Sequence, residues 1–311
     1  MRISEEKIKS SDERTMLSCR LWEPEDIKPK AALQIIHGMS EHISRYDEFA
    51  GFLCDRGFAV FGDDHLGHGD TVRNCGGIPG YFSEKDGDSL LVEDAHRVNL
   101  YLRDRFPCVP CAILGHSMGS FILRAYLAHY RDADAAVIMG TSGACLPYGA
   151  AVALASCIAA MKGSGYRSPL LKKLSVGSYN RAFETPGCSG WEWLTRDDEV
   201  VRAYVEDEVC GFDFTAAGYR DLFRLLGTVQ RRAWSKCVPH DIPILLVSGA
   251  LDPVGENGRG VERVASRLRC AGCKDVSVTL YEGCRHEILN ETCRGEVFED
   301  IFVFLKEAVK I

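Results

Sequence analysis

A serine stands between two glycines at residues 115–119, where the sequence reads Gly115-His116-Ser117-Met118-Gly119. This is a G-x-S-x-G pattern, preceded by the apolar run CAIL and followed by the helix-like run FILRAYLAHY. Glycines at both ends permit the sharp strand-to-helix turn that lifts a serine hydroxyl above the edge of a sheet. The pattern therefore predicts that Ser117 is a nucleophile.

A serine hydroxyl reacts poorly at neutral pH, so it needs a base, and the base needs a carboxylate that orients it. On this type of turn both partners are expected downstream, in the order Ser, Asp, His. Asp252 follows the apolar run IPILLVSG (242–249), and His286 follows the run DVSVTLYEG (275–283). Both positions lie where strands of an open parallel sheet end, which is where such sheets place reacting groups. We expect Ser117, His286 and Asp252 to form a catalytic triad.

A tetrahedral intermediate needs amide donors for its oxyanion. The N–H of the residue after the nucleophile, Met118, is one expected donor, because the start of a helix directs its amides toward that point. The second is expected from the loop after the early strand that ends in IIHG, and this predicts the N–H of Met39. His37 is expected to support that loop rather than to act in catalysis.

The elements that must position these residues alternate between strand and helix. Continuous apolar strands separated by amphipathic helices indicate a mostly parallel sheet covered on both faces, which is a doubly wound α/β fold. A segment at about 143–235 interrupts this order and is predicted to be a mostly helical cap inserted into a core made of 1–142 and 236–311. The predicted strands are 31–37, 58–64, 111–117, 135–140, 242–249 and 275–283, and the predicted helices are 46–57, 89–106, 118–130, 261–270 and 296–309.

Other residue clusters favour structural roles. The stretch DDHLGHGDT (63–71) places two histidines among aspartates, but its glycines indicate a tight loop rather than a rigid metal-binding face. Two C-x-x-C pairs, at 108/111 and 270/273, stand about 160 residues apart, far more than in compact zinc modules. No metal site is therefore expected. Trp191 and Trp193 are interpreted as packing residues of the insertion.

Composition narrows the class of protein. The 311 residues carry a net charge of −7 with scattered basic residues, which argues against a nucleic-acid partner. The amino end lacks the apolar core of a secretory signal, so the 14 cysteines are expected to be free thiols in the reducing cytoplasm. Residues 144–161 form an uncharged stretch of 18, interpreted as a buried or surface-docking helix that lines an acyl channel or touches a lipid surface.

Several motifs together resemble the monoacylglycerol lipase and lysophospholipase branch of the α/β-hydrolases, which is grouped with serine aminopeptidase-like proteins. They are HGMSEHISRY, FGDDHLGHGDT, GHSMGS, SGALDPVG and YEGCRHEILNE, spread from about residue 31 to the carboxyl end except for the insertion. The resemblance implies the same triad and oxyanion donors, a helical cap over an apolar acyl channel, and no metal or organic cofactor. It also implies that Glu41 and Arg45 bind near the alcohol part of the substrate.

The sequence departs from the family pattern at two informative points. Ser120 replaces the second glycine of the more usual GHSMGG, and Leu289 stands where animal monoglyceride lipases carry a second histidine. The leading prediction is a serine ester hydrolase acting on single-chain acyl esters, with a small-molecule substrate. Two alternatives stay open: a short-chain or aromatic esterase or peptidase with the same triad, and a non-catalytic binding protein on a hydrolase scaffold.

Overall fold

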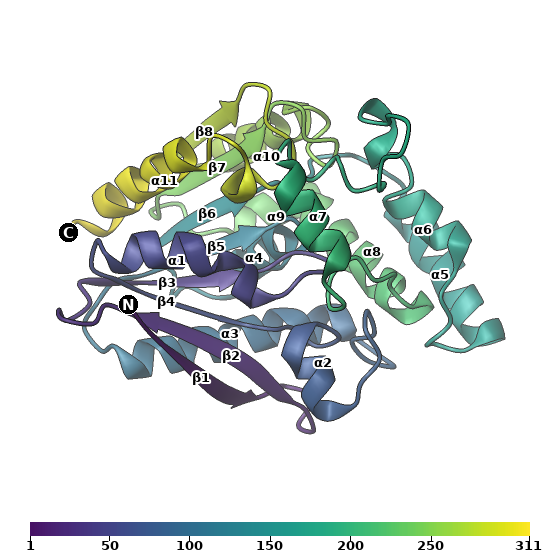
Figure 1. Cartoon of the computed structure of the whole chain (residues 1–311), viewed down its shortest axis with the longest axis horizontal. Helices are drawn as coiled ribbons and strands as arrows, with labels where there is room; N and C mark the ends of the chain where they lie inside the picture. Colours follow the sequence, from purple (N-terminus) through teal and green to yellow (C-terminus); the bar gives the residue numbers. More distant parts are fainter.

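The computed structural model describes all 311 residues and contains one sheet of eight strands (Figure 1). The strand order is β1-β2-β4-β3-β5-β6-β7-β8, in which β1 pairs with β2 and β2 with β4 antiparallel, and every other pair is parallel. The strands are β1 (Arg2–Lys9), β2 (Met16–Glu23), β3 (Ala31–Ile36), β4 (Phe58–Asp63), β5 (Cys111–His116), β6 (Ala135–Met139), β7 (Ile244–Gly249) and β8 (Val276–Tyr281).

Helices cover both faces of the sheet, as the continuous apolar strands predict. Every residue of β3, β4, β5, β6 and β7 is buried. Helices α1 (Asp47–Cys54) and α11 (Arg294–Val309) pack on one face, and α3 (Gly87–Arg105), α4 (Met118–His129) and α10 (Arg259–Ala271) pack on the other (Figure 1). The predicted α/β fold with a doubly wound, mostly parallel sheet is confirmed.

The amino-terminal hairpin is the part of the sheet that the sequence did not predict. Strand β1 pairs with β2 from Arg2 opposite Glu23 to Lys9 opposite Met16. Asp12 holds the turn between them, because its carboxylate accepts hydrogen bonds from the N–H groups of Arg14 and Thr15 at 2.8 and 2.7 Å. No residue of β1 is fully buried, so this edge strand lacks the apolar pattern that marks the central strands.

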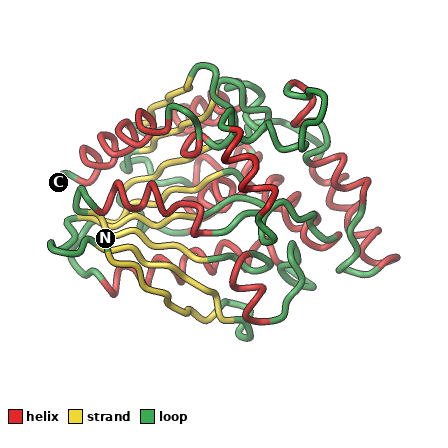
Figure 2. Tube along the Cα trace, in the orientation of Figure 1, coloured by secondary structure: helices red, strands yellow, loops and turns green.

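Between β6 and β7 the chain forms five α-helices and no strand (Figure 2). They are α5 (Tyr148–Lys162), α6 (Pro169–Ser175), α7 (Asp198–Glu206), α8 (Ala216–Gln230) and α9 (Arg232–Cys237). Because β6 and β7 are neighbours in the sheet, this segment leaves and returns at one place. Its division from the core as a cap at 143–235 stays a prediction. None of the helices combines the length and the apolar character needed to cross a membrane.

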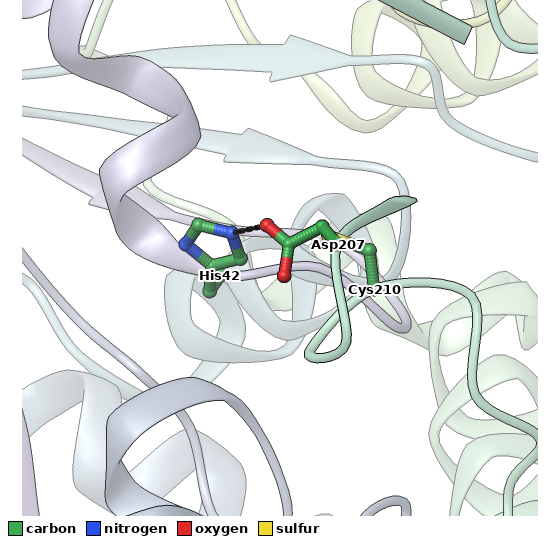
Figure 3. A group of neighbouring side chains, drawn as sticks. All are labelled: His42, Asp207 and Cys210. Carbon is green, nitrogen blue, oxygen red and sulfur yellow. Dashed lines mark hydrogen bonds and ion pairs between the residues drawn. The ribbon is translucent and has the colours of Figure 1, made fainter. Parts of the chain in front are cut away.

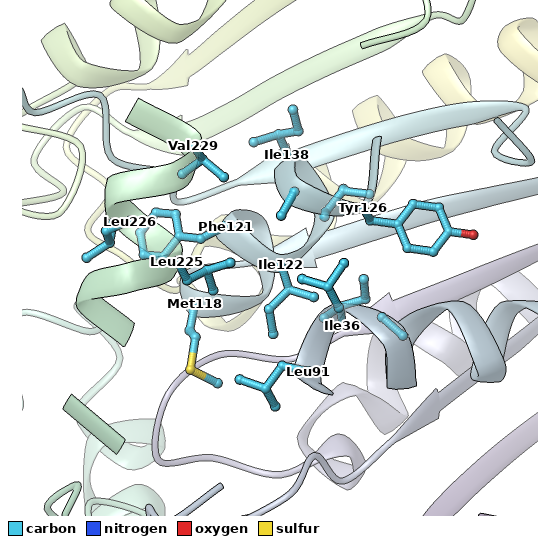
Figure 4. Packing of buried hydrophobic residues seen from close by; sticks show 14 of the residues in the cluster. Ile36, Leu91, Met118, Phe121, Ile122, Tyr126, Ile138, Leu225, Leu226 and Val229 are labelled. Carbon is cyan, nitrogen blue, oxygen red and sulfur yellow. The ribbon is translucent and has the colours of Figure 1, made fainter. Parts of the chain in front are cut away.

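Helix α8 joins the inserted segment to the rest of the molecule through apolar contacts. Leu225, Leu226 and Val229 of α8 belong to the same buried cluster as Phe121 and Ile122 of α4 (Figure 4). All five side chains are at most 9 % exposed. The helix that starts directly after Ser117 is therefore packed on several sides, which gives the Ser117 turn a rigid support.

Candidate active site

Ser117 occupies the turn between β5 and α4 with a backbone strain that the G-x-S-x-G pattern predicts. Its φ is 53°, a region that residues with a side chain rarely adopt, at a typical cost of about 1–3 kcal/mol. The Ser117 N–H donates to the carbonyl of Met139 at 2.9 Å. A Cβ on Gly119 would overlap the carbonyl oxygens of Ile36 and His37, so only glycine lets α4 approach β3 this closely.

The predicted acid and base lie side by side. His286 Nδ1 is 2.9 Å from Asp252 Oδ1, and both side chains are at least 98 % buried. Two further donors hold Asp252: the N–H of Val254 at 2.9 Å and the hydroxyl of Ser248 at 3.0 Å. Asp252 is therefore fixed as an acceptor that faces the imidazole.

The electrostatics of this pair suit a base. Burial alone would raise the pKa of Asp252, but the imidazole and the two donors outweigh burial, and the pKa lies below its ordinary value. Burial alone would lower the pKa of His286, but the Asp252 carboxylate outweighs it, and the pKa lies above its ordinary value. The aspartate therefore stays charged and stabilises the protonated imidazole.

Aromatic rings enclose the imidazole of His286. The rings of Trp193 and His116 each have their centroids 4.9 Å from that of His286. The backbone N–H of His286 also donates to the backbone carbonyl of Trp193 at 3.3 Å. Trp193 is a buried packing residue, as interpreted from the sequence, but its contact with His286 was missed. The two residues are 93 positions apart, and no spacing or motif signals such a contact.

In the loop after β3, the amides on both sides of Met39 have acceptors. The N–H of Gly38 donates to Glu41 Oε1 at 2.6 Å, and that of Ser40 donates to His68 Nε2 at 3.2 Å. The N–H of Met39, between them, has no acceptor within the protein. A Cβ on Gly38 would lie 3.1 Å from the Cβ of Ser117, so this loop passes directly against Ser117.

A buried ion network lies behind this loop. The Glu41 carboxylate accepts hydrogen bonds from Arg45 at 2.8 Å and Tyr46 at 3.1 Å, and its Oε1 is 3.0 Å from His116 Nδ1. Arg45 in turn binds both oxygens of Glu287 at 2.7 and 2.6 Å. Burial would raise the pKa of Glu41, but His116 and Arg45 hold it well below its ordinary value. These contacts keep the loop and the residue after His286 in one charged cluster.

Glu41 and Arg45, expected near the alcohol part of a substrate, are thus engaged with other protein groups. Glu41 lines the cavity described below, and Arg45 is not among the residues that line it. Their role in substrate binding stays a prediction.

The histidines of the 63–71 stretch support the loop after β3. The rings of His37 and His65 stack with centroids 3.9 Å apart, and the His65 N–H donates to His37 Nε2 at 3.2 Å. Burial lowers the pKa of His68 to about 3, so its neutral Nε2 can accept the Ser40 N–H. The rings of His37, His65 and His68 each form a hydrogen bond with a backbone group of these loops.

A second group of polar residues ties the same loop to the inserted segment (Figure 3). His42 Nε2 lies 2.8 Å from Asp207 Oδ2. Together with the Cys210 sulfur they form a cluster in which a His42 nitrogen, an Asp207 carboxylate oxygen and the sulfur lie within 4.8 Å of one another. The N–H of Gly211 donates to the carbonyl of Ser40 at 2.9 Å. The segment after α7 is therefore docked on the loop that carries Met39.

One large cavity opens over these residues. Its volume is about 640 Å³, and 19 of its 33 lining residues are hydrophobic, so its wall is mainly apolar. Ser117, Met39, Met118 and His286 all line it. Apolar walls come from α8 and from the inserted segment before it, and include Leu174, Val176, Tyr179, Trp191, Leu222 and Leu226.

This fold and this serine turn define the class of the protein: it is an α/β-hydrolase. A family model described as serine aminopeptidase, S33 matches residues 27–293, and the chain belongs to that family. The resemblance stated from the motifs is therefore confirmed.

Curated relatives and solved structures agree on the kind of enzyme. A monoacylglycerol lipase of Mycolicibacterium smegmatis is 30 % identical over 90 % of this chain and 89 % of its own, and a monoglyceride lipase of Homo sapiens is 26 % identical over 94 % and 87 %. A thermostable carboxyl esterase from Bacillus coagulans, solved with glycerol, has a TM-score of 0.92 at 27 % identity and covers 99 % of each chain. These findings confirm an enzyme of the serine ester hydrolase type.

Proposed function

We propose that the protein hydrolyses esters of a single fatty acyl chain, such as monoacylglycerols or lysophospholipids, through a Ser117–His286–Asp252 triad. The observation that carries this proposal is that Ser117 and His286 line the same mainly apolar cavity, with His286 held by Asp252 at 2.9 Å. An apolar cavity of this size suits an acyl chain, and the strained serine turn sets a nucleophile at its wall.

In this mechanism His286 accepts the proton of the Ser117 hydroxyl as the oxygen attacks the ester carbonyl. Asp252 orients the imidazole and stabilises its charged form. The N–H groups of Met39 and Met118 stabilise the oxyanion, and loss of one such donor typically costs about 100- to 1000-fold in rate. His286 then gives the proton to the leaving alcohol, and water hydrolyses the acyl-enzyme by the same steps.

We further propose that the segment containing α5 and α6 contacts lipid. Exposed large apolar side chains gather there: Leu146, Met161, Tyr166, Leu170 and Leu174 are each at least 41 % exposed within 29 residues. Lys162 and Lys173 lie in the same stretch and can meet anionic head groups. Leu146 and Leu174 also line the cavity, so a lipid surface at this segment would lie beside the entrance for a substrate.

The test compares wild type with Ser117→Ala, with Ser266→Ala as the control, because Ser266 is exposed on α10. Each protein is assayed on p-nitrophenyl esters of graded chain length, on monoacylglycerols and on lysophosphatidylcholine. The proposal expects activity on long single-chain esters that Ser117→Ala loses by at least about 1000-fold and Ser266→Ala keeps. Retained turnover in Ser117→Ala would contradict the serine mechanism.

The same panel separates the alternatives. Maximal activity on acetyl or butyryl esters would favour a short-chain esterase. Turnover of amino-acid p-nitroanilides would favour a peptidase, the activity named in the family's description. Failure of a fluorophosphonate probe to label Ser117 would favour a binding protein.

A further inference from the structure

We propose that Cys284 and Cys293 form a reversible disulfide that closes the loop carrying His286 into a ring. The two sulfur atoms lie 3.1 Å apart, with the base in the loop between them. A disulfide bond is about 2.0 Å long, so the sulfur atoms need to approach by only about 1 Å. This cross-link does not depend on which ester the enzyme cleaves.

The chain around both cysteines is already held in place. The N–H of Cys284 donates to the carbonyl of Tyr281 at 3.2 Å, and its own carbonyl accepts the N–H of Leu251 at 2.9 Å. Cys293 caps α11, and its carbonyl accepts the N–H of Glu296 at 3.0 Å. Bond formation therefore requires side-chain rotation and a small shift at the start of α11, while the backbone of His286 can stay where it is.

A buried carboxylate holds the two ends of this loop together independently of the sulfurs. Glu291, which is fully buried, accepts the N–H of Arg285 at 2.8 Å and Arg196 Nε at 2.9 Å. The other end of the Arg196 guanidinium reaches the sulfurs, with Nη2 3.2 Å from Cys284 Sγ and 3.8 Å from Cys293 Sγ. The Arg196 cation favours the thiolate, which is the form that attacks a disulfide, but burial and the neighbouring Cys293 outweigh it and raise the pKa of Cys284 to about 12.

The oxidant required is a low-molecular-weight disulfide. Cys293 is only half-buried whereas Cys284 is 1 % exposed, so Cys293 attacks first. Its thiolate bonds to one sulfur of the small disulfide and releases the other half as a thiol. Cys284 then gives up its proton as its sulfur attacks the Cys293 sulfur, and the second small thiolate leaves and takes up a proton. Two protein thiols are oxidised, and one small disulfide is reduced to two thiols.

The expected consequence is a more stable His286 loop with the catalytic geometry kept. Closing a ring of about ten residues restricts the unfolded chain, and this corresponds to a rise in Tm of roughly 3–6 °C. Ester hydrolysis at 25 °C is expected to change by less than about twofold, because Glu291 and Arg196 already define the reduced loop.

The experiment incubates the full chain with oxidised glutathione, blocks remaining thiols and digests with trypsin. Cleavage after Arg285 separates residues 275–285 from 286–294, so a disulfide is detected as these two peptides joined, and dithiothreitol separates them. Cys293→Ser is expected to lose both the joined peptides and the rise in Tm. Cys188→Ser, which removes a cysteine of the same intermediate exposure, keeps both.

Two results would overturn the proposal. One is absence of the joined peptides while the exposed Cys75 takes up glutathione, which shows that the oxidant reached the protein. The other is an equal rise in Tm for oxidised wild type and Cys293→Ser, which would assign the stabilisation to another site. Both readouts are independent of catalysis, so loss of activity in Ser117→Ala and formation of the disulfide are judged separately.

Discussion

Arg45 binds both carboxylate oxygens of Glu287, the residue that directly follows His286. Through its bond to Glu41, the same guanidinium reaches the loop that carries Met39. One buried cation therefore joins the loop after β3 to the loop after β8, which are about 240 residues apart in the chain.

Replacing this cation leaves two buried carboxylates without their partner. Arg45→Met is expected to reduce the free energy of unfolding by about 3–5 kcal/mol at pH 7, the usual cost of breaking a buried ion pair on one side. Urea denaturation measures it. Arg73→Met is the control, because Arg73 is 52 % exposed and pairs with an exposed aspartate, so less than about 1 kcal/mol should be lost.

The same variant has a pH signature. Burial would raise the pKa of Glu287, but Arg45 outweighs it and lowers the pKa below the ordinary value of 4.5. A carboxyl whose pKa is lower in the folded than in the unfolded state stabilises the fold at pH values above its unfolded-state pKa. This stabilisation is lost as the pH falls through its folded-state pKa. The difference between wild type and Arg45→Met should therefore shrink as pH falls below about 4.5. A difference that grows on acidification would contradict this assignment.

Asp252→Asn tests the orientation of the base. An amide cannot stabilise the protonated imidazole, and it favours the wrong tautomer of His286, so kcat is expected to fall about 10⁴-fold with little change in KM. Steady-state kinetics on a p-nitrophenyl ester measure this. Asp55→Asn, at an exposed position after α1, should leave both constants unchanged. A loss of less than about tenfold in Asp252→Asn would remove Asp252 from the triad.

The pH dependence of kcat/KM reports the free His286. Only the neutral imidazole can accept the serine proton, so kcat/KM should rise with pH and level off above the pKa of His286. Burial lowers that pKa but Asp252 outweighs burial, so the midpoint is expected above the ordinary value of 6.5. A midpoint below that value, or a rate independent of pH between about 5 and 9, would contradict His286 as the base.

The fold could be predicted from the sequence wherever burial of an element requires a recognisable pattern of apolar residues. Strand β7 is a continuous apolar run because both of its faces are covered, and the glycines around Ser117 mark a turn that only small residues permit. The hairpin of β1 and β2 was missed because β1 lies at an edge with no fully buried residue, so pairing rather than apolar content decides its structure.

The contacts that finish the site depend on tertiary structure. Glu291 stands five residues after His286, and its sequence context is that of any loop carboxylate, yet it is fully buried and bonds Arg285 and Arg196. Trp193 was assigned to packing for the same reason: its contact with His286 joins the inserted segment to the loop after β8. Motifs therefore indicated the groups that we propose to react, whereas the residues that hold them could be found only from the structure.

Met161 and Leu170 test the proposed contact with lipid. Their side chains are 69 % and 49 % exposed on α5 and α6, and transfer of such groups into a lipid interface is worth about 1–2 kcal/mol each. The double variant Met161→Ser/Leu170→Ser should bind anionic vesicles at least about 30-fold more weakly, as measured by co-sedimentation. Hydrolysis of a soluble short p-nitrophenyl ester should not change, because neither residue lines the cavity.

Val303→Ser removes a side chain of 47 % exposure from α11, away from this segment, and should leave vesicle binding intact. Equal binding by wild type and the double variant would exclude α5 and α6 as the lipid-contacting segment.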